Sequence, residues 1–104
     1  MKLYLSGPMQ GYPEHNFPAF EEARKLLRYA GYRVTCPAEL GKCDGWAWEE
    51  YLRRDLKVLL DCEAVATLPG YELSRGATLE VGVALQLNMR VEPVEFWLTY
   101  RLAK

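Results

Sequence analysis

An apolar run that passes through a turn into a helical pattern constrains the fold of this chain more than any other feature. Residues 64–68 are apolar and rich in β-formers, and Pro69-Gly70 directly after them is a strong turn signal. Apolar residues then recur at helical spacing, which predicts a helix over residues 75–87. A strand that leads through a short loop into a helix is the repeating unit of sheets with parallel strands.

The rest of the chain alternates in the same way. Further strands are predicted over residues 2–6, 32–36 and 90–92, and further helices over residues 18–30 and 46–60, the latter with Asp44 as its N-cap. The tail alternates apolar and polar residues from Val94 onward, which favours an edge strand, with a short helix from Glu95 as the alternative. The pattern predicts an α/β three-layer sandwich with a mostly parallel sheet of four to five strands, of the flavodoxin or Rossmann type.

Composition narrows the class of protein. The 104 residues are half hydrophobic, which suits one domain over residues 1–104 with one core. A net charge of −1 offers no basic footprint for a nucleic acid polymer. Three cysteines without a C-x-x-C pair, beside one histidine, argue against a disulfide framework and a zinc site, and indicate reduced thiols in the cytoplasm. We expect no leader and no membrane span, because no apolar segment is long enough to cross a bilayer.

The start of the helix over residues 75–87 is a candidate anion site. Ser74, Arg75 and Gly76 supply a hydroxyl, a guanidinium and free backbone N–H groups at a helix N-terminus, where the helix dipole also attracts negative charge. Glu80 follows one turn later, among small and apolar neighbours that do not suit a solvated face. The alternative is a surface glutamate beside an ordinary turn.

Two further stretches contribute candidate residues. The loop over residues 9–16 follows the first strand at the carboxyl edge of the sheet, where ligands bind in open parallel sheets. Within it, Asn16 either lines a pocket or caps the following helix. Tyr51 and Asp55 share one helical face, whereas Trp46 and Trp48 are expected to pack or to form an interface rather than to stack on a ligand.

These motifs together resemble one known family. Four short motifs occur in register and in order between about residues 2 and 91: YLSGPM (4–9), NFP (16–18), RDL (54–56) and SRGA (74–77) followed by Glu80. In this the chain resembles the nucleoside 2-deoxyribosyltransferase superfamily, above all its small bacterial and phage-encoded members. The resemblance does not cover the tail beyond Val91.

The resemblance implies roles for individual residues. Glu80 would attack the anomeric carbon of a 2-deoxyribonucleoside, Asp55 would assist at the base, and Tyr4 would steady the glutamate. It implies no metal and no organic cofactor. The residues it places around the substrate are Ser6, Gly7, Pro8, Met9, Asn16, Ser74, Arg75 and Gly76.

The residue types before the catalytic helix favour a nucleotide as the substrate. Transferases of this family that act on free nucleosides carry an aspartate for the 5′-hydroxyl, whereas this chain has Ser74 with Arg75 and Gly76. An aspartate would repel a phosphate, which a serine, an arginine and backbone N–H groups would hold. The predicted function is therefore an N-glycosidase acting on 2′-deoxynucleoside 5′-monophosphates. A base-exchanging deoxyribosyltransferase and a nucleotide-binding module without turnover are the alternatives.

Aromatic residues predict a homodimer or a larger homo-oligomer. Trp46, Trp48, Trp97 and Tyr100 have no obvious core partner in the pattern, and such residues are enriched at interfaces. Family members commonly pair, and the helix over residues 46–60 is the expected contact. The alternative is that these aromatic side chains pack under the C-terminal tail.

Overall fold

The computed structural model describes residues 1–41 and 43–103 of the chain. Its strands are β1 (Lys2–Ser6), β2 (Arg33–Thr35), β3 (Ala64–Thr67) and β4 (Arg90–Pro93). Its helices are α1 (Phe17–Tyr29), α2 (Pro37–Leu40), α3 (Trp48–Leu60), α4 (Arg75–Gln86) and α5 (Val94–Ala103), with short 3-10 turns η1 (Pro13–Asn16) and η2 (Tyr71–Leu73).

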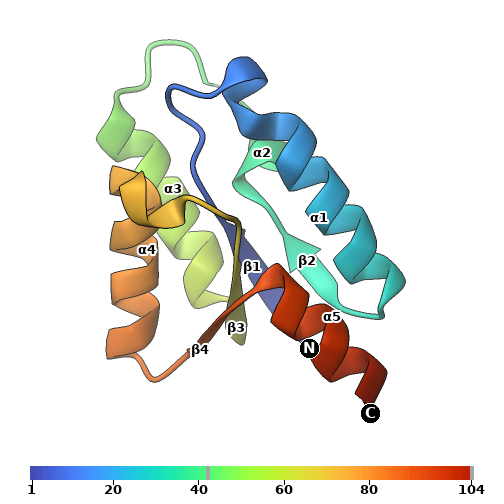
Figure 1. Ribbon diagram of the computed structural model, residues 1–104. Helices are drawn as coiled ribbons and strands as arrows, with labels where there is room; N and C mark the ends of the chain where they lie inside the picture. Colours follow the sequence, from blue (N-terminus) through green and yellow to red (C-terminus); the bar gives the residue numbers. More distant parts are fainter. Residues whose placement is uncertain (42, 104) are drawn as a thin grey trace.

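All four strands form one parallel sheet in the order β2-β1-β3-β4. Figure 1 shows α1 and α5 on one face of this sheet and α3 and α4 on the other. Both faces of the sheet therefore carry helices, as is usual for a parallel sheet. The predicted three-layer α/β sandwich is confirmed, with four strands.

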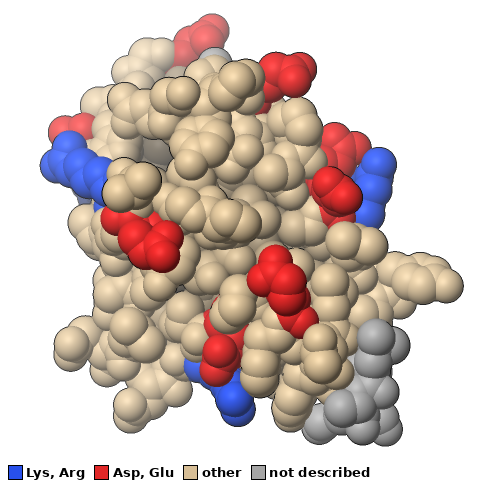
Figure 2. Space-filling view, in the orientation of Figure 1, with Lys and Arg blue, Asp and Glu red and all other residues tan. Residues whose placement is uncertain are grey.

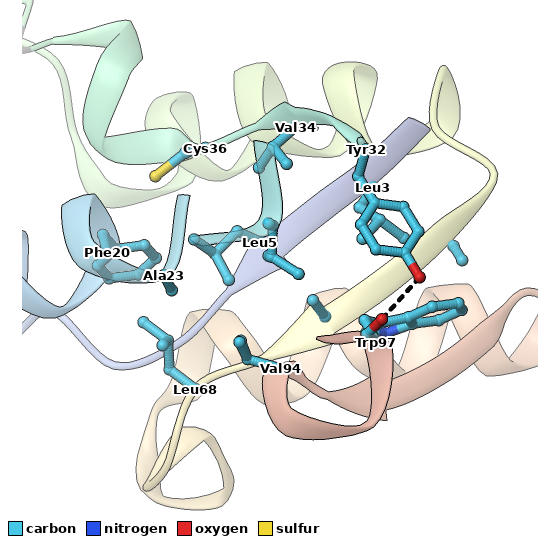
Figure 3. Packing of buried hydrophobic residues seen from close by; sticks show 13 residues of the cluster. Leu3, Leu5, Phe20, Ala23, Tyr32, Val34, Cys36, Leu68, Val94 and Trp97 are labelled. Carbon is cyan, nitrogen blue, oxygen red and sulfur yellow. Dashed lines mark hydrogen bonds between the residues drawn. The ribbon is translucent and has the colours of Figure 1, made fainter. Parts of the chain in front are cut away.

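The alternation of side chains along β1 divides the core into two parts. Leu3 and Leu5 point toward α1 and α5, where they pack with Phe20, and Figure 3 shows this cluster. Tyr4 points to the opposite face and packs against Leu59 of α3 together with residues of α4. Because successive side chains of a strand point to opposite faces, Ser6 lies on the same side as Tyr4. The side chains of Tyr4 and Ser6 thus both point toward α3 and α4.

The tail forms the helix α5. The favoured prediction of an edge strand is therefore wrong, and the alternative prediction of a short helix is confirmed. Val94 and Trp97 are three residues apart and both are buried, with 6% and 1% of their surface exposed. The Trp97 indole donates a hydrogen bond to the Val65 carbonyl oxygen at 3.0 Å, and the Tyr32 hydroxyl donates to the Trp97 carbonyl oxygen at 2.7 Å (Figure 3). Period-2 alternation and i,i+3 spacing both fit so short a segment, and burial of the indole decides for the helix.

Trp97 also corrects part of the expectation about unpartnered aromatic residues. Its ring is a core residue, and Tyr100 lies edge-on to it at 5.9 Å. The Phe96 ring stacks on Tyr100 at 5.6 Å. These three aromatic residues belong to the tail helix and pack with one another and against the core, so Trp97 and Tyr100 do have core partners.

The entry to α3 differs from the prediction as well. The helix begins at Trp48 with Ala47 in the cap position, so Asp44 is not the N-cap. The Glu50 side chain accepts a hydrogen bond from the backbone N–H of Ala47 at 3.2 Å, so this N–H group has a partner at the start of the helix. The loop prediction also missed α2, which starts at Pro37 directly after the second strand.

Candidate active site

A pocket of about 900 Å³ lies at the carboxyl edge of the sheet, at the upper end in Figure 1. Its walls come from the loop after β1, the start of α2, one face of α3 and the N-terminal turns of α4. Segments that follow β1, β2 and β3 meet here because the strands are parallel and end at the same edge. This is the position at which open α/β sheets bind ligands.

Glu80 lines this pocket from α4, although only 5% of its surface is exposed. Its Oε2 accepts a hydrogen bond from the Tyr4 hydroxyl and its Oε1 accepts one from the Ser6 hydroxyl, each at 2.7 Å. Both donors are completely buried. The face of β1 that carries Tyr4 and Ser6 therefore fixes the orientation of the carboxyl group from behind.

Burial controls the charge of this carboxyl. Desolvation raises the pKa of Glu80 to about 7, against the two hydrogen bonds from Ser6 and Tyr4, which favour the charged form. The negative charge of Asp55 is a smaller cause of the same rise. The Tyr4 pKa is itself raised well above its ordinary value, mainly by burial and then by the Glu80 charge, so this hydroxyl remains a donor.

Asp55 lines the same pocket from α3, with 14% of its side chain exposed. Its Oδ1 accepts a hydrogen bond from Arg54 Nε at 3.1 Å. Burial raises the pKa of Asp55, and the Arg54 hydrogen bond and charge oppose this rise. The pocket therefore holds two carboxyl groups that interact electrostatically and are both shifted toward proton retention, an arrangement suited to acid–base chemistry.

The first turn of α4 lies in the same pocket and remains open to an anion. Ser74 caps the helix, since its Oγ accepts the N–H of Ala77 at 3.2 Å and its carbonyl oxygen accepts the N–H of Thr78 at 2.9 Å. The N–H groups of Arg75 and Gly76 then have no acceptor within the helix. A Cβ at Gly76 would meet only the Trp48 indole nitrogen, at 3.9 Å, so the backbone is accessible there.

The Arg75 guanidinium stacks on Trp48 at 3.8 Å from the ring centroid. This contact holds the positive charge beside the helix start while its N–H edges stay available. Trp48 was expected to pack or to form an interface; the structure places it in the pocket wall. Helical spacing contained the signal, because residues 48, 51, 52 and 55 share one face of α3 and all four line the pocket.

Some of the remaining predicted site residues line the pocket, and the others support it from behind. Gly7, Pro8 and Met9 line the pocket together with the residues of α3 and α4 described above. Asn16 supports this loop, since its side-chain amide donates to the Pro8 carbonyl oxygen at 2.8 Å and makes no capping hydrogen bond to α1. Tyr4 and Ser6 reach the pocket only through Glu80.

The loop before α1 has a backbone that the sequence did not indicate. Glu14, His15 and Asn16 all have positive φ angles, of 53°, 54° and 62°. Each left-handed residue other than glycine costs roughly 1–2 kcal/mol, so the surrounding contacts impose this turn. His15 lines the pocket as a result.

Within residues 1–41 and 43–103, no group of three or more His, Cys, Asp or Glu side chains is placed to hold a metal ion. The same residues contain no helix that is both long and apolar enough to cross a membrane.

Comparison with known proteins adds a family and a fold. A family model described as a domain of unknown function, DUF4406, matches residues 1–92. No curated protein matches the sequence. Among solved structures, a 2-deoxyribosyltransferase from Bacillus psychrosaccharolyticus has 22% identity and a TM-score of 0.70, over 88% of this chain and 69% of its own length.

Two other solved structures are similar. A 2-deoxyribosyltransferase from Leishmania mexicana shows 16% identity and a TM-score of 0.66, over 86% of this chain and 61% of its own length. A conserved protein from Enterococcus faecalis V583 shows 22% identity and a TM-score of 0.63, over 88% of this chain and 60% of its own length. At such identities the likeness is one of fold, and at that level the resemblance stated from the sequence is confirmed.

Proposed function

The chain belongs to the DUF4406 family of domains of unknown function, and from this premise we propose that it is an N-glycosidase cleaving 2′-deoxynucleoside 5′-monophosphates. The observation that carries the proposal is the Glu80 carboxyl, held by Tyr4 and Ser6 in the wall of a pocket that also contains Asp55. A buried, oriented carboxylate facing a second carboxyl group is the arrangement that glycosidic bond cleavage uses. Two of the similar structures are 2-deoxyribosyltransferases, which break the same kind of bond.

In the first step the ionised Glu80 attacks the anomeric carbon of the deoxyribose. An ester bond forms between a carboxylate oxygen and this carbon, and the bond from the carbon to the base nitrogen breaks with its electron pair leaving on the base. Tyr4 and Ser6 limit the carboxylate to one orientation, which lowers the entropic part of the barrier. The leaving base receives a proton from Asp55, whose raised pKa keeps a proton available.

In the second step water replaces the base. Asp55, now ionised, accepts a proton from a water molecule that attacks the same carbon, and the ester bond to Glu80 breaks. The products are the free base and deoxyribose 5-phosphate, and both carboxyl groups return to their starting states. The chemistry is balanced by these two side chains and water.

A phosphate on the substrate fits the first turn of α4. The N–H groups of Arg75 and Gly76, the Ser74 hydroxyl and the Arg75 guanidinium all lie at the pocket, and no acidic side chain stands at the cap position. Such a group of donors binds a phosphate dianion more strongly than a neutral hydroxyl. For this reason we favour hydrolysis of nucleotides over base exchange between free nucleosides as the activity of this protein.

The alternative supported by the similar structures is base exchange. A transferase would use the same Glu80 ester but would transfer the sugar to a second base instead of water. The two activities differ only in the acceptor that reaches the ester. A binding module without turnover is less well supported, because binding a nucleotide does not require Tyr4, Ser6 and Asp55 around a buried glutamate. We also propose that two copies of the chain form a homodimer.

The decisive experiment is incubation with each deoxynucleoside monophosphate, with the free base followed by chromatography. A second base is added in a parallel series, and Glu80→Gln serves as the inactive control. Base release without the second base supports the hydrolase. Release only when the second base is present, with formation of the exchanged nucleotide, identifies a transferase. No release in either series contradicts the enzymatic proposal.

A further inference from the structure

The Arg54 side chain joins α3 to the chain that follows α2. Its Nε donates to Oδ1 of Asp55 at 3.1 Å. Its Nη1 donates to the carbonyl oxygens of Leu40 and Gly41 at 3.3 and 2.7 Å. The side chain is mostly buried, with 20% of its surface exposed. Its Nε and Nη1 are therefore used for contacts inside the fold, although the side chain also lines the pocket.

The same face of α3 holds this segment at a second point. The Tyr51 hydroxyl accepts the N–H of Cys43 at 2.9 Å and donates to the carbonyl oxygen of Cys43 at 3.0 Å. The Trp46 ring lies edge-on to Tyr51 at 5.3 Å, and the Arg54 guanidinium lies 5.3 Å from the Tyr51 ring and 5.7 Å from the Trp46 ring. Since Gly41 lines the pocket, these contacts fix part of its wall.

The hydrogen bond between Arg54 and Asp55 also determines which oxygen of the Asp55 carboxyl group can carry a proton. A guanidinium has only donors, so Oδ1 of Asp55 must act as an acceptor. A proton on Asp55 therefore sits on Oδ2. The other titratable groups that act on this site are Glu80 from α4 and Tyr4 from β1, while Arg75 of α4 lines the same pocket. Arg54 is the cation in direct contact with Asp55.

We propose that Arg54 is a positioning residue for the general acid: it directs the transferable proton of Asp55 to Oδ2 and ties this orientation to the pocket wall at Gly41. The inference rests on the function proposed above. Arg54 acts through Asp55 and does not contact the reacting atoms. Its loss should lower kcat with little change in KM.

Two substitutions and one matched control test this role. Arg54→Gln removes the guanidinium, and Arg54→Lys keeps the charge but cannot serve Asp55 and two carbonyl oxygens together. Arg53→Gln removes an equal charge from the exposed neighbouring position of the same helix. We expect Arg54→Gln to lower kcat about 10- to 100-fold, part of the 10²–10⁴-fold that an acid of this kind supplies. Arg54→Lys should lie between, and Arg53→Gln should match the wild type.

A double substitution separates positioning from a structural role. If Arg54 acts through Asp55, Arg54→Gln should lower kcat no further in an Asp55→Asn protein than Asp55→Asn does alone. The alkaline limb of the pH–rate profile should also move to higher pH in Arg54→Gln, because the carboxyl group loses a neighbouring positive charge. Equal losses of kcat with and without Asp55, or an unchanged profile, would overturn the proposal. Should Arg54→Gln fail to fold, Arg54→Lys decides by the first criterion, the loss of kcat with and without Asp55, because lysine keeps the positive charge.

The structural part can be measured without turnover. Carbon-detected NMR titration should give a higher pKa for the Asp55 carboxyl in Arg54→Gln than in the wild type, and no difference in Arg53→Gln. If the wild type releases no base, the proposed function fails, and this titration still tests the contact between Arg54 and Asp55. If the wild type is active and the titration shows no difference, the Arg54 inference alone is wrong.

Discussion

Glu80 combines burial with a need for charge, and the two requirements oppose each other. The role of nucleophile proposed for Glu80 requires an ionised carboxylate, yet the protein around this side chain stabilises its protonated form and raises its pKa to about 7. Tyr4 and Ser6 reduce this penalty by donating to one oxygen each. The result is a carboxylate with little solvation, which reacts more readily than a hydrated one and still forms near neutral pH.

The first prediction concerns activity and stability together. Glu80→Gln should lower the rate of base release by several orders of magnitude. The variant should still fold, because the glutamine amide can form hydrogen bonds with the hydroxyls of Tyr4 and Ser6. The folded-state pKa of about 7 lies above the ordinary value of 4.5, so stability from this group is complete below 4.5 and lost as the pH rises to 7 and beyond. The difference corresponds to about 3 kcal/mol. Urea unfolding from pH 4 to pH 9 should show this decline in the wild type and not in Glu80→Gln; parallel curves would contradict it.

A second residue prediction addresses the phosphate. Ser74→Asp should preserve α4, because aspartate is also a good N-cap, while its charge repels a phosphate. We expect kcat/KM for deoxynucleoside monophosphates to fall about 10- to 100-fold, the range for losing a hydrogen bond to a charged group. Activity on the corresponding nucleosides should not fall. Thr78→Asp places the same charge on the exposed side of α4, outside the pocket, as the control. A wild type with equal rates on nucleotides and nucleosides would instead favour the transferase.

Among the elements, α5 depends most on a single side chain. Trp97 fills the core beneath the helix and satisfies the Val65 carbonyl oxygen of the central strand β3. Trp97→Ala should lower the free energy of unfolding by about 3–5 kcal/mol, and Trp97→Phe by about 1–3 kcal/mol through the lost hydrogen bond. Tyr29→Ala, on a side chain that is 92% exposed, should change it little. Urea unfolding measures all three, and a mild effect of Trp97→Ala would show that α5 is not part of the core.

Elements with strong local signals could be predicted, and those set by long-range contacts could not. The parallel strands and the helices α1, α3 and α4 follow from apolar spacing and from turn residues such as Pro69 and Gly70. The tail was ambiguous because Val94, Phe96 and Leu98 alternate with their neighbours as in a strand, whereas the spacing of Val94 and Trp97 fits a helix. Only the burial of Trp97 in the folded chain selects the helix. The left-handed turn ending at Asn16 has no local signal, since it depends on a hydrogen bond to Pro8.

The site shows the same division. Glu80 and the first turn of α4 were visible as a carboxylate among small residues near a helix start, and Asp55 was assigned by resemblance. The positioning role proposed for Arg54 could not be predicted from the sequence. Its acceptors are carbonyl oxygens at the end of α2 and just after it, residues 40–41, and only the fold brings them near. Ser6 was predicted to bind the substrate, and the structure places it behind Glu80. Spacing finds residues that share an element, whereas contacts between elements need the structure.

At the scale of the whole molecule, the two faces of the sheet have different tasks. The side covered by α1 and α5 holds the larger apolar cluster, including Phe20 and Trp97. The side covered by α3 and α4 has a smaller apolar cluster and carries Tyr4, Ser6 and Glu80. The polar site thus replaces part of the core on that side. Its helices can gain stability by burying their outer surfaces against another molecule.

The outer surface of α4 fits such a contact better than that of α3, where dimerisation was first expected. The exposed positions of α3 carry charges at Glu49, Glu50, Arg53 and Lys57. On α4, by contrast, Glu80 is the sole charged residue between Gly76 and Met89, and it is buried. Leu79 and Leu85 are 40% and 57% exposed, and a Cβ at Gly82 would meet nothing within 4 Å. In Figure 2 the lower left of the surface, where α4 ends, shows no charged side chain, whereas charged side chains gather at the upper left, near the start of α4.

The final prediction is therefore a homodimer with a two-fold axis at α4. An uncharged helix face with exposed leucines on either side of a glycine can pack closely against its own copy, because no side chain at Gly82 separates the backbones. Leu79→Glu would place two carboxylates close to the axis and should give a folded monomer, while Leu26→Glu, at a similarly exposed position of α1, should leave the dimer intact. Light scattering at micromolar concentration measures the mass of each protein. Since α4 also carries Glu80 and the turn that we propose to bind phosphate, we expect the monomeric variant to lose part of its kcat as α4 becomes less rigid. A wild type that is monomeric and fully active at this concentration would show that the site is complete in one chain.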